Sequence, residues 1–158
     1  MALQTSTQNS YCSHQQLVLQ KLFKILNYEL LTSQIYLELG KDTQYSENSD
    51  LHSLSIRALE EDETHCRLIS RSINRYVEEL NVDNPSPNEQ QFHLDQYSIS
   101  DKIKLLQRTE TLLVKAYHNL CALTIENDYR MFDLAFCNGI ENANHVESLN
   151  SFFVLNGK

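Results

Sequence analysis

Glycine and proline are scarce in this chain of 158 residues, with three and two occurrences respectively. An all-β fold needs many turns that draw on these residue types, so their scarcity disfavours such a fold and favours long, uninterrupted helices. No run of apolar residues exceeds four positions, which is too short to span a membrane. The length suits a single domain that can bury a hydrophobic core without disulfide bonds.

Basic residues are also few, since 13 Lys and Arg stand against 21 Asp and Glu, for a net charge of −8. This balance excludes a broad nucleic-acid-binding surface, which needs clustered basic side chains, and it suits a protein that collects cations. The four cysteines form no CxxC pair, and the first fourteen residues lack the pattern of a secretory signal. We therefore predict reduced thiols and a cytoplasmic location, with neither nucleic acid nor membrane as a partner.

Four segments carry apolar residues at the spacing of three and four that is typical of helices. They run over about residues 15–41, 48–80, 100–125 and 128–155, and no alternating β pattern persists between them. This pattern predicts an all-α, four-helix bundle domain over residues 15–158. Residues 1–14 are rich in Ser, Thr and Gln, and we predict that they form a disordered polar tail.

The connections between these segments indicate the topology of the bundle. Two of them, at 42–47 and 126–128, are short, so each joins two neighbouring helices into an antiparallel hairpin. The third covers residues 81–99 and contains Pro85 and Pro87. Nineteen extended residues can reach roughly 60 Å, whereas a helix of 27 residues is about 40 Å long. We therefore expect two hairpins joined by a crossover that runs the length of the bundle.

Ionisable and amide side chains interrupt the apolar stripe of every segment. A buried carboxylate without a partner costs several kcal/mol, so such residues need one another or a ligand. A single case usually reflects a hydrogen-bonded core residue, but here all four helices contribute. The residues concerned are Glu29, Asp62, His65, Glu110, Asn142 and His145.

Their positions along the chain predict that these side chains meet. Glu29 and Asp62 are 33 residues apart and centred on the first short connection, and Glu110 and Asn142 are 32 apart and centred on the second. Each therefore lies about 24 Å from its turn, near the middle of the bundle. If the crossover places the two turns at opposite ends, all four residues lie at one level.

The second and fourth helices each place a histidine three residues after this level. Asp62-x-x-His65 and Asn142-x-x-His145 project both of their side chains from one helix face. Carboxylates and imidazoles together are ligands that suit iron, manganese or zinc. Carboxylate-bridged di-metal centres in four-helix proteins typically take a Glu from one helix and a carboxylate-x-x-His motif from the next, and they use this combination once in each hairpin.

These residues lie in stretches that resemble the ferritin superfamily, and bacterioferritin in particular. The similarity covers about residues 15–155 and includes Leu26–Leu30, Tyr36, Asp62–His65, Asp128-Tyr129 and His145–Glu147. That family oxidises Fe(II) with oxygen or peroxide and stores the ferric mineral in a shell of twenty-four subunits. The resemblance implies ligands for two irons: Glu29, Asp62 and His65 at one, Glu110 and His145 at the other, with Tyr36 beside them.

The chain departs from the family's pattern at the bridging positions. Asp62 and Asn142 both stand where the family has Glu, and an amide is a poor iron ligand. Glu141 is a candidate substitute for the missing acid, and we expect the second metal position to be weakened. The haem-ligating Met of bacterioferritins falls at Glu63, so no haem is expected there.

The resemblance implies an iron-storage protein that oxidises Fe(II) at a di-iron centre. Because of the departures, a ferritin-like structural or metal-binding protein with a degenerate centre is an alternative. A rubrerythrin-like di-iron peroxidase is another, although the cysteine pairs of a rubredoxin-type site are missing. We expect a homo-oligomer, with the family's shell of twenty-four subunits as its form.

Overall fold

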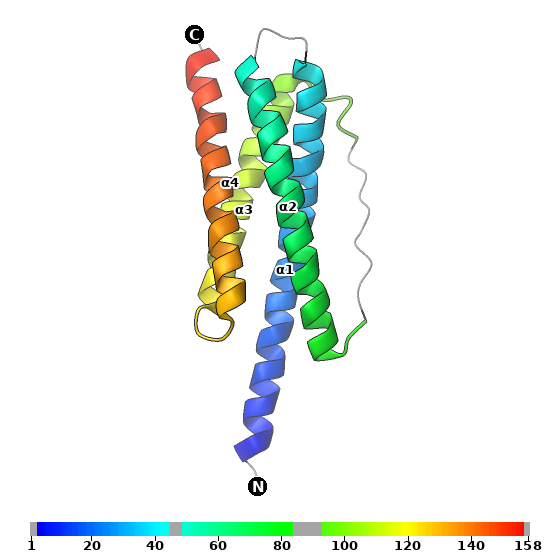
Figure 1. The fold of residues 1–158 in the computed structure, drawn as a ribbon, viewed down its shortest axis with the longest axis vertical. Coiled ribbons are helices and arrows are strands. Elements are labelled where there is room, and N and C mark those ends of the chain that lie inside the picture. The colour runs from blue at the N-terminus through cyan, green and yellow to red at the C-terminus, as the bar shows by residue number, and fades with distance from the viewer. Residues whose placement is uncertain (1–2, 45–48, 84–92, 157–158) are drawn as a thin grey trace.

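The computed structural model describes residues 3–44, 49–83 and 93–156, and within them it contains four helices and no strand. The helices are α1 (Leu3–Thr43), α2 (Ser49–Leu80), α3 (Ile99–Thr124) and α4 (Tyr129–Asn156). They lie side by side as a bundle (Figure 1), which confirms the predicted all-α class. Within the described ranges, no helix has the length and apolar character needed to cross a membrane.

The helices form two antiparallel hairpins, α1 with α2 and α3 with α4. Each helix packs against two others: α1 contacts α2 and α3, and α4 contacts α3 and α2. α2 ends at the lower end of the bundle in Figure 1 and α3 begins at the upper end, so the chain crosses the whole length between them, as predicted. Residues 84–92 of this crossover, with both prolines, lie outside the described residues.

Local side-chain and backbone features set the helix ends. Ser98 Oγ accepts a hydrogen bond from the backbone N–H of Asp101 at 3.1 Å and caps the start of α3. Asp128 Oδ1 accepts one from the Met131 N–H at 3.0 Å in the first turn of α4. α2 ends where Asn81 adopts a left-handed φ of 50°, a conformation that Asn tolerates better than most residues.

The first helix begins earlier than expected, at Leu3 rather than near Gln15. Residues 3–14, which we expected in a disordered polar tail, are therefore helical in the structure. This segment contains neither Gly nor Pro, so nothing in it ends a helix. Once a helix is nucleated, each added residue contributes a hydrogen bond, and α1 extends beyond the bundle (Figure 1).

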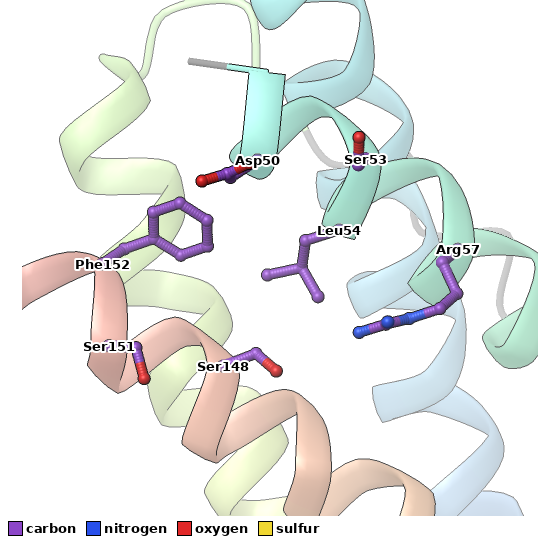
Figure 2. Close-up of a pocket in the computed structure, with 7 residues that line it drawn as sticks. All are labelled: Asp50, Ser53, Leu54, Arg57, Ser148, Ser151 and Phe152. Atoms are coloured by element: carbon purple, nitrogen blue, oxygen red, sulfur yellow. The ribbon is translucent and has the colours of Figure 1, made fainter.

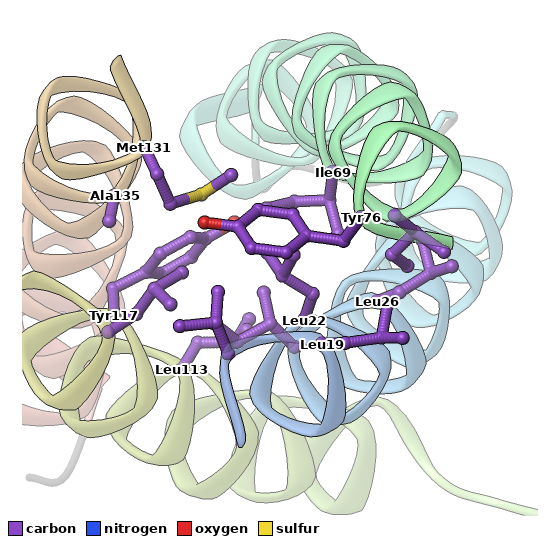
Figure 3. Close-up of a cluster of buried hydrophobic side chains, with 13 residues drawn as sticks. Leu19, Leu22, Leu26, Ile69, Tyr76, Leu113, Tyr117, Met131 and Ala135 are labelled. Carbon is purple, nitrogen blue, oxygen red and sulfur yellow. The ribbon is translucent and has the colours of Figure 1, made fainter. Parts of the chain in front are cut away.

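The core is divided into two apolar clusters along the bundle. In the cluster shown in Figure 3, all four helices contribute side chains, among them Leu22, Ile69, Leu113 and Met131. The second cluster lies nearer the α1–α2 turn, with residues such as Ile35 of α1. On every helix, the polar positions singled out in the sequence fall between the residues of the two clusters. The fold therefore encloses a polar layer between two apolar ones.

Candidate metal centre

The structure brings the six polar side chains together in this layer. Each is no more than 1% exposed, and together they come from all four helices: Glu29 from α1, Asp62 and His65 from α2, Glu110 from α3, and Asn142 and His145 from α4. The convergence follows from the helical rise, because all of these residues lie at similar distances from their turns.

Two groups of three residues in the layer have the geometry of a metal site. One consists of Glu29, Asp62 and His65, and the other of Asp62, Glu110 and His145. In each group, one ligand atom per residue lies within 4.8 Å of the others. Asp62 belongs to both groups, so its carboxylate stands where it can bridge two cations.

His65 connects the first group to the outside of the bundle. Its Nδ1 lies 3.2 Å from Glu29 Oε1 inside the layer. Its Nε2 lies 2.6 Å from Oε2 of Glu141, a residue of α4 whose side chain is 48% exposed. A hydrogen bond from Nε2–H to this carboxylate fixes the ring and leaves Nδ1 available as a metal ligand.

His145 is held in the same way from the opposite hairpin. Its Nδ1 hydrogen-bonds with Glu110 Oε1 at 3.1 Å, and its Nε2 hydrogen-bonds with Glu61 Oε2 at 2.6 Å. Glu61 belongs to α2, so each histidine contacts an outer carboxylate across the α2–α4 pair. These two contacts fix both rings and join the two hairpins.

Two buried tyrosines hold the glutamates of the layer. Tyr36 of α1 donates to Glu110 Oε1 at 2.8 Å, and Tyr117 of α3 donates to Glu29 Oε1 at 2.5 Å. Each tyrosine thus supports the glutamate of the other hairpin. A Cβ on Gly139 would lie 3.2 Å from the Cβ of Tyr117, so glycine allows α4 to approach α3 at this point.

The layer has an internal two-fold pattern that the sequence analysis missed. Glu-x6-Tyr occurs in α1 and α3, and Glu-(Asp/Asn)-x-x-His occurs in α2 and α4. These repeated spacings could have identified Tyr117 and Glu61, neither of which was singled out. The matching pairs are Glu29 with Glu110, Tyr36 with Tyr117, Glu61 with Glu141, His65 with His145, and Asp62 with Asn142. Only the last pair differs in chemical type.

Glu141 does not take the place of the missing acid. Its carboxylate contacts the outer nitrogen of His65 and belongs to neither group of three. The inner position is held by Asn142, which is fully buried and whose Nδ2 donates to Glu29 Oε1 at 3.3 Å. The protein therefore places three carboxylates and two imidazoles around the centre, with an amide at the fourth acidic position.

Several acceptor atoms of the layer are buried without a hydrogen bond. A buried polar atom that lacks a partner costs about 1–3 kcal/mol, so a cluster of them needs an explanation. All of them can donate an electron pair to a cation, and a bound metal ion would satisfy them together. They are Glu29 Oε2, both oxygens of Asp62, Glu110 Oε2 and Asn142 Oδ1.

The surroundings raise the pKa of two side chains in the layer, Asp62 and His145. Burial raises the pKa of Asp62 well above its usual range, and the charges of Glu29 and Glu110 raise it further. Burial lowers the pKa of His145, but hydrogen bonding and charge from Glu110, followed by Asp62 and Glu61, outweigh this and raise it to about 9. A metal ion must therefore displace protons when it binds.

A surface cavity of about 380 Å³ lies between α2 and α4, near the α1–α2 turn (Figure 2). Its lining includes Asp50, Leu54 and Arg57 of α2 and Phe152 of α4, and no residue of the polar layer. Arg57 Nε is 3.9 Å from Glu61 Oε1. The cavity therefore lies one helical turn from Glu61, the outer hydrogen-bond partner of His145. It lies beside the candidate centre and does not contain it.

The bundle topology and the central polar layer define a ferritin-like four-helix fold. The fold is similar to that of a dodecameric thioferritin, the bacterioferritin-related protein from Bacteroides fragilis, with a TM-score of 0.73. The two chains are 17% identical, and the similar region covers 89% of this chain and 86% of the other. No protein-family model and no curated protein sequence matches this chain.

Proposed function

We propose that the protein binds iron in the polar layer and oxidises Fe(II) there, as the first step of iron storage. The observation that carries this proposal is the cluster of buried acceptor atoms without a hydrogen bond, which a bound cation would satisfy together. The ferritin-like fold supports it, since the similar structure is described as a bacterioferritin-related protein.

Each residue has a defined part in this proposal. Glu29 and His65 would hold one iron and Glu110 and His145 the other, and Asp62 belongs to both groups of ligands. Two Fe(II) ions bound side by side can pass electrons to one molecule of oxygen or peroxide. The two buried tyrosines fix the glutamates, and the apolar clusters on either side keep bulk water away from the centre. Because Asn142 supplies a neutral amide instead of a fourth carboxylate, the second iron is bound more weakly than the first.

A ferritin-like protein with a degenerate, non-catalytic centre is the second candidate. Asn142 favours it, because a neutral amide stands where a bridging carboxylate would offset the charge of the metal ions. Under this alternative the layer binds one metal ion or none. The number of ions bound per chain, together with ferric product formation, separates the two candidates.

We further propose that the protein is a homo-oligomer in the cytoplasm. The similar thioferritin is described as a dodecamer, and this gives no support to the shell of twenty-four subunits expected from the sequence. An exposed apolar stripe on α4 supports association, since Tyr129, Phe136 and Ile140 are 72%, 53% and 47% exposed. Twelve copies of the 18.4 kDa chain would have a mass of about 220 kDa, and twenty-four about 440 kDa.

The test is an anaerobic titration of the metal-free protein with Fe(II), followed by admission of air. We expect binding of about two ions per chain and rapid appearance of ferric absorbance. His65→Ala should lower the stoichiometry with unchanged helical content, whereas His118→Ala, at an exposed position of α3, should leave it unaltered. Absence of bound iron in the folded wild-type chain would refute the proposal. Peroxide turnover without mineral would instead indicate a peroxidase.

A further inference from the structure

We infer that the surface cavity between α2 and α4 binds a small organic monoanion, namely a carboxylate attached to an aromatic body. Arg57 receives the carboxylate, and Leu54 and Phe152 contact the aromatic body. The cavity is lined by no residue of the polar layer, so this site is separate from the proposed metal centre. The inference therefore goes beyond iron binding and requires no metal ion.

The cavity has the size and the two-sided lining of a ligand site. Its volume of about 380 Å³ lies within the range of roughly 300–1,000 Å³ that is usual for small-molecule pockets. Asp50, Leu54 and Arg57 follow the spacing i, i+4, i+7 and so share one face of α2. Ser148 and Phe152 likewise share one face of α4. The short side chain of Ser148 leaves open a space that a larger residue would fill.

The guanidinium of Arg57 is available to an anion. Its side chain is 61% exposed, and within the described residues its ion pair is with Glu61, at 3.9 Å from Nε to Oε1. This distance is too long for a hydrogen bond, and an exposed ion pair contributes little to stability. A ligand that attracts the guanidinium away from Glu61 therefore loses little free energy. In return, a carboxylate can accept two parallel N–H bonds from the guanidinium.

The charges around the cavity favour a ligand with a single negative charge. Among the lining residues that the structure describes, Arg57 is the one cation, and Asp50 lies at the opposite end of the lining (Figure 2). The two residues are seven positions apart, or about 10.5 Å along α2. Glu61 adds a second carboxylate near Arg57. A phosphate group, with nearly two negative charges, would meet one guanidinium and two carboxylates, so a carboxylate is the better match.

The space between the two charged ends suits an aromatic ring. The side chains of Leu54 and Phe152 point into it from α2 and α4 (Figure 2), and Leu54 is only 5% exposed. A ring of the ligand would bury apolar area against Leu54 and contact the ring of Phe152. Ser148 Oγ donates to the Asn144 carbonyl at 2.9 Å, so its oxygen remains as an acceptor. Asp50 is a further acceptor, and a hydroxyl at the far end of the ligand would donate to it.

The experiment titrates the full-length, metal-free chain with 4-hydroxybenzoate, which carries a carboxylate and a hydroxyl on opposite sides of an aromatic ring. Calorimetry should show saturable binding of one molecule per chain. The neutral 4-hydroxybenzamide, which has nearly the same shape, should bind at least about tenfold more weakly. Inorganic phosphate should not displace the bound acid. No saturable binding at millimolar 4-hydroxybenzoate, equal binding of the amide, or displacement by phosphate would overturn the inference.

Protein variants test the location of the bound molecule. Arg57→Gln should weaken the binding of 4-hydroxybenzoate by at least about tenfold, because it removes the charged donor. The matched control is Arg67→Gln, at an exposed arginine of the same helix that does not line the cavity, and it should leave the affinity unchanged. An equal loss in both variants would show that the acid responds to general charge and would overturn the inference.

A variant that fills the cavity tests the location without a change of charge. Ser148→Leu should abolish binding, with helical content and unfolding temperature retained. Binding that survives this change would place the molecule elsewhere. The orientation is tested by Asp50→Ala, which should remove the preference for 4-hydroxybenzoate over benzoate. A preference that survives would overturn the assigned contact with Asp50. All of these measurements use the metal-free chain, so their failure leaves the proposed iron binding intact, and failure of the Fe(II) titration leaves this inference intact.

Discussion

Tyr117 of α3 donates a hydrogen bond of 2.5 Å to Glu29 Oε1 of α1, 88 positions earlier in the chain. Both residues are fully buried, and Tyr36 makes the corresponding bond to Glu110. The two hairpins therefore exchange tyrosine hydroxyls across the centre. A hydroxyl that fixes a carboxylate in this way orients its other oxygen as a ligand.

Removal of this hydroxyl should affect both folding and metal binding. Tyr117→Phe leaves a buried carboxylate oxygen with one donor fewer, and we expect a loss of about 1.5–3 kcal/mol in the free energy of unfolding. The cobalt(II) affinity should fall roughly tenfold or more because Glu29 is less well oriented. Denaturant unfolding and calorimetry measure the two effects. Tyr97→Phe, at a 43% exposed tyrosine outside the bundle core, should change neither.

A variant at Glu141 tests whether this carboxylate binds the metal ion itself or only orients the metal-binding ring of His65. As the outer partner of His65, it fixes the ring and does not contact the ion. Glu141→Ala should therefore lower the cobalt affinity by about 10–100-fold and leave the number of ions per chain unchanged. A reduced stoichiometry at saturating cobalt would show instead that Glu141 moves inward and acts as a ligand. Glu147→Ala, which removes a carboxylate from the same helix away from the layer, is the matched control.

The level of the centre could be predicted from the sequence, but the contacts that its supporting residues make could not. The rise of a helix is fixed, so distance from a turn places Glu29 and Asp62 at one height before any contact is known. The contacts of Glu61 and Glu141 depend on how closely α2 and α4 approach, which no single helix determines. The apolar stripe predicts the inward position of Asn142, but whether Glu141 turns inward in its place depends on the rotation of α4 about its axis.

The stability of the metal-free protein should fall as the pH rises from about 6.5 to about 9. The pKa of His145 is raised from 6.5 to about 9 in the folded chain by Glu110, Asp62 and Glu61, despite the opposing effect of burial. The folded state therefore binds this proton more tightly than the unfolded state. The resulting stabilisation is complete below about pH 6.5 and is lost as the pH passes about 9.

Unfolding temperatures measured across this pH range provide the check, with His145→Gln as the comparison. The variant should lose this part of the pH dependence, and a profile identical to that of the wild type would contradict the assignment to His145. Cobalt affinity should change in the opposite sense and rise with pH, because the ion must displace the same proton.

The exposed stripe on α4 predicts where association can be weakened. Tyr129, Phe132, Phe136 and Ile140 follow the helical spacing, and the rings of Phe132 and Phe136 stack with centroids 6.0 Å apart. Large aromatic side chains that become buried between subunits carry much of the binding energy, so a charge in their midst should be costly.

Phe136→Lys should therefore weaken self-association by at least about tenfold, measured as a fall in mass by light scattering towards that of the 18.4 kDa chain. Val82→Lys, at a 38% exposed apolar residue that follows α2, is the control and should retain the assembled mass. If the wild-type protein assembles and Phe136→Lys does not lower its mass, the stripe is not part of the contact. If the wild-type protein is itself a monomer, the proposed homo-oligomer is wrong, while metal binding within each chain is unaffected because every residue of the centre belongs to one bundle.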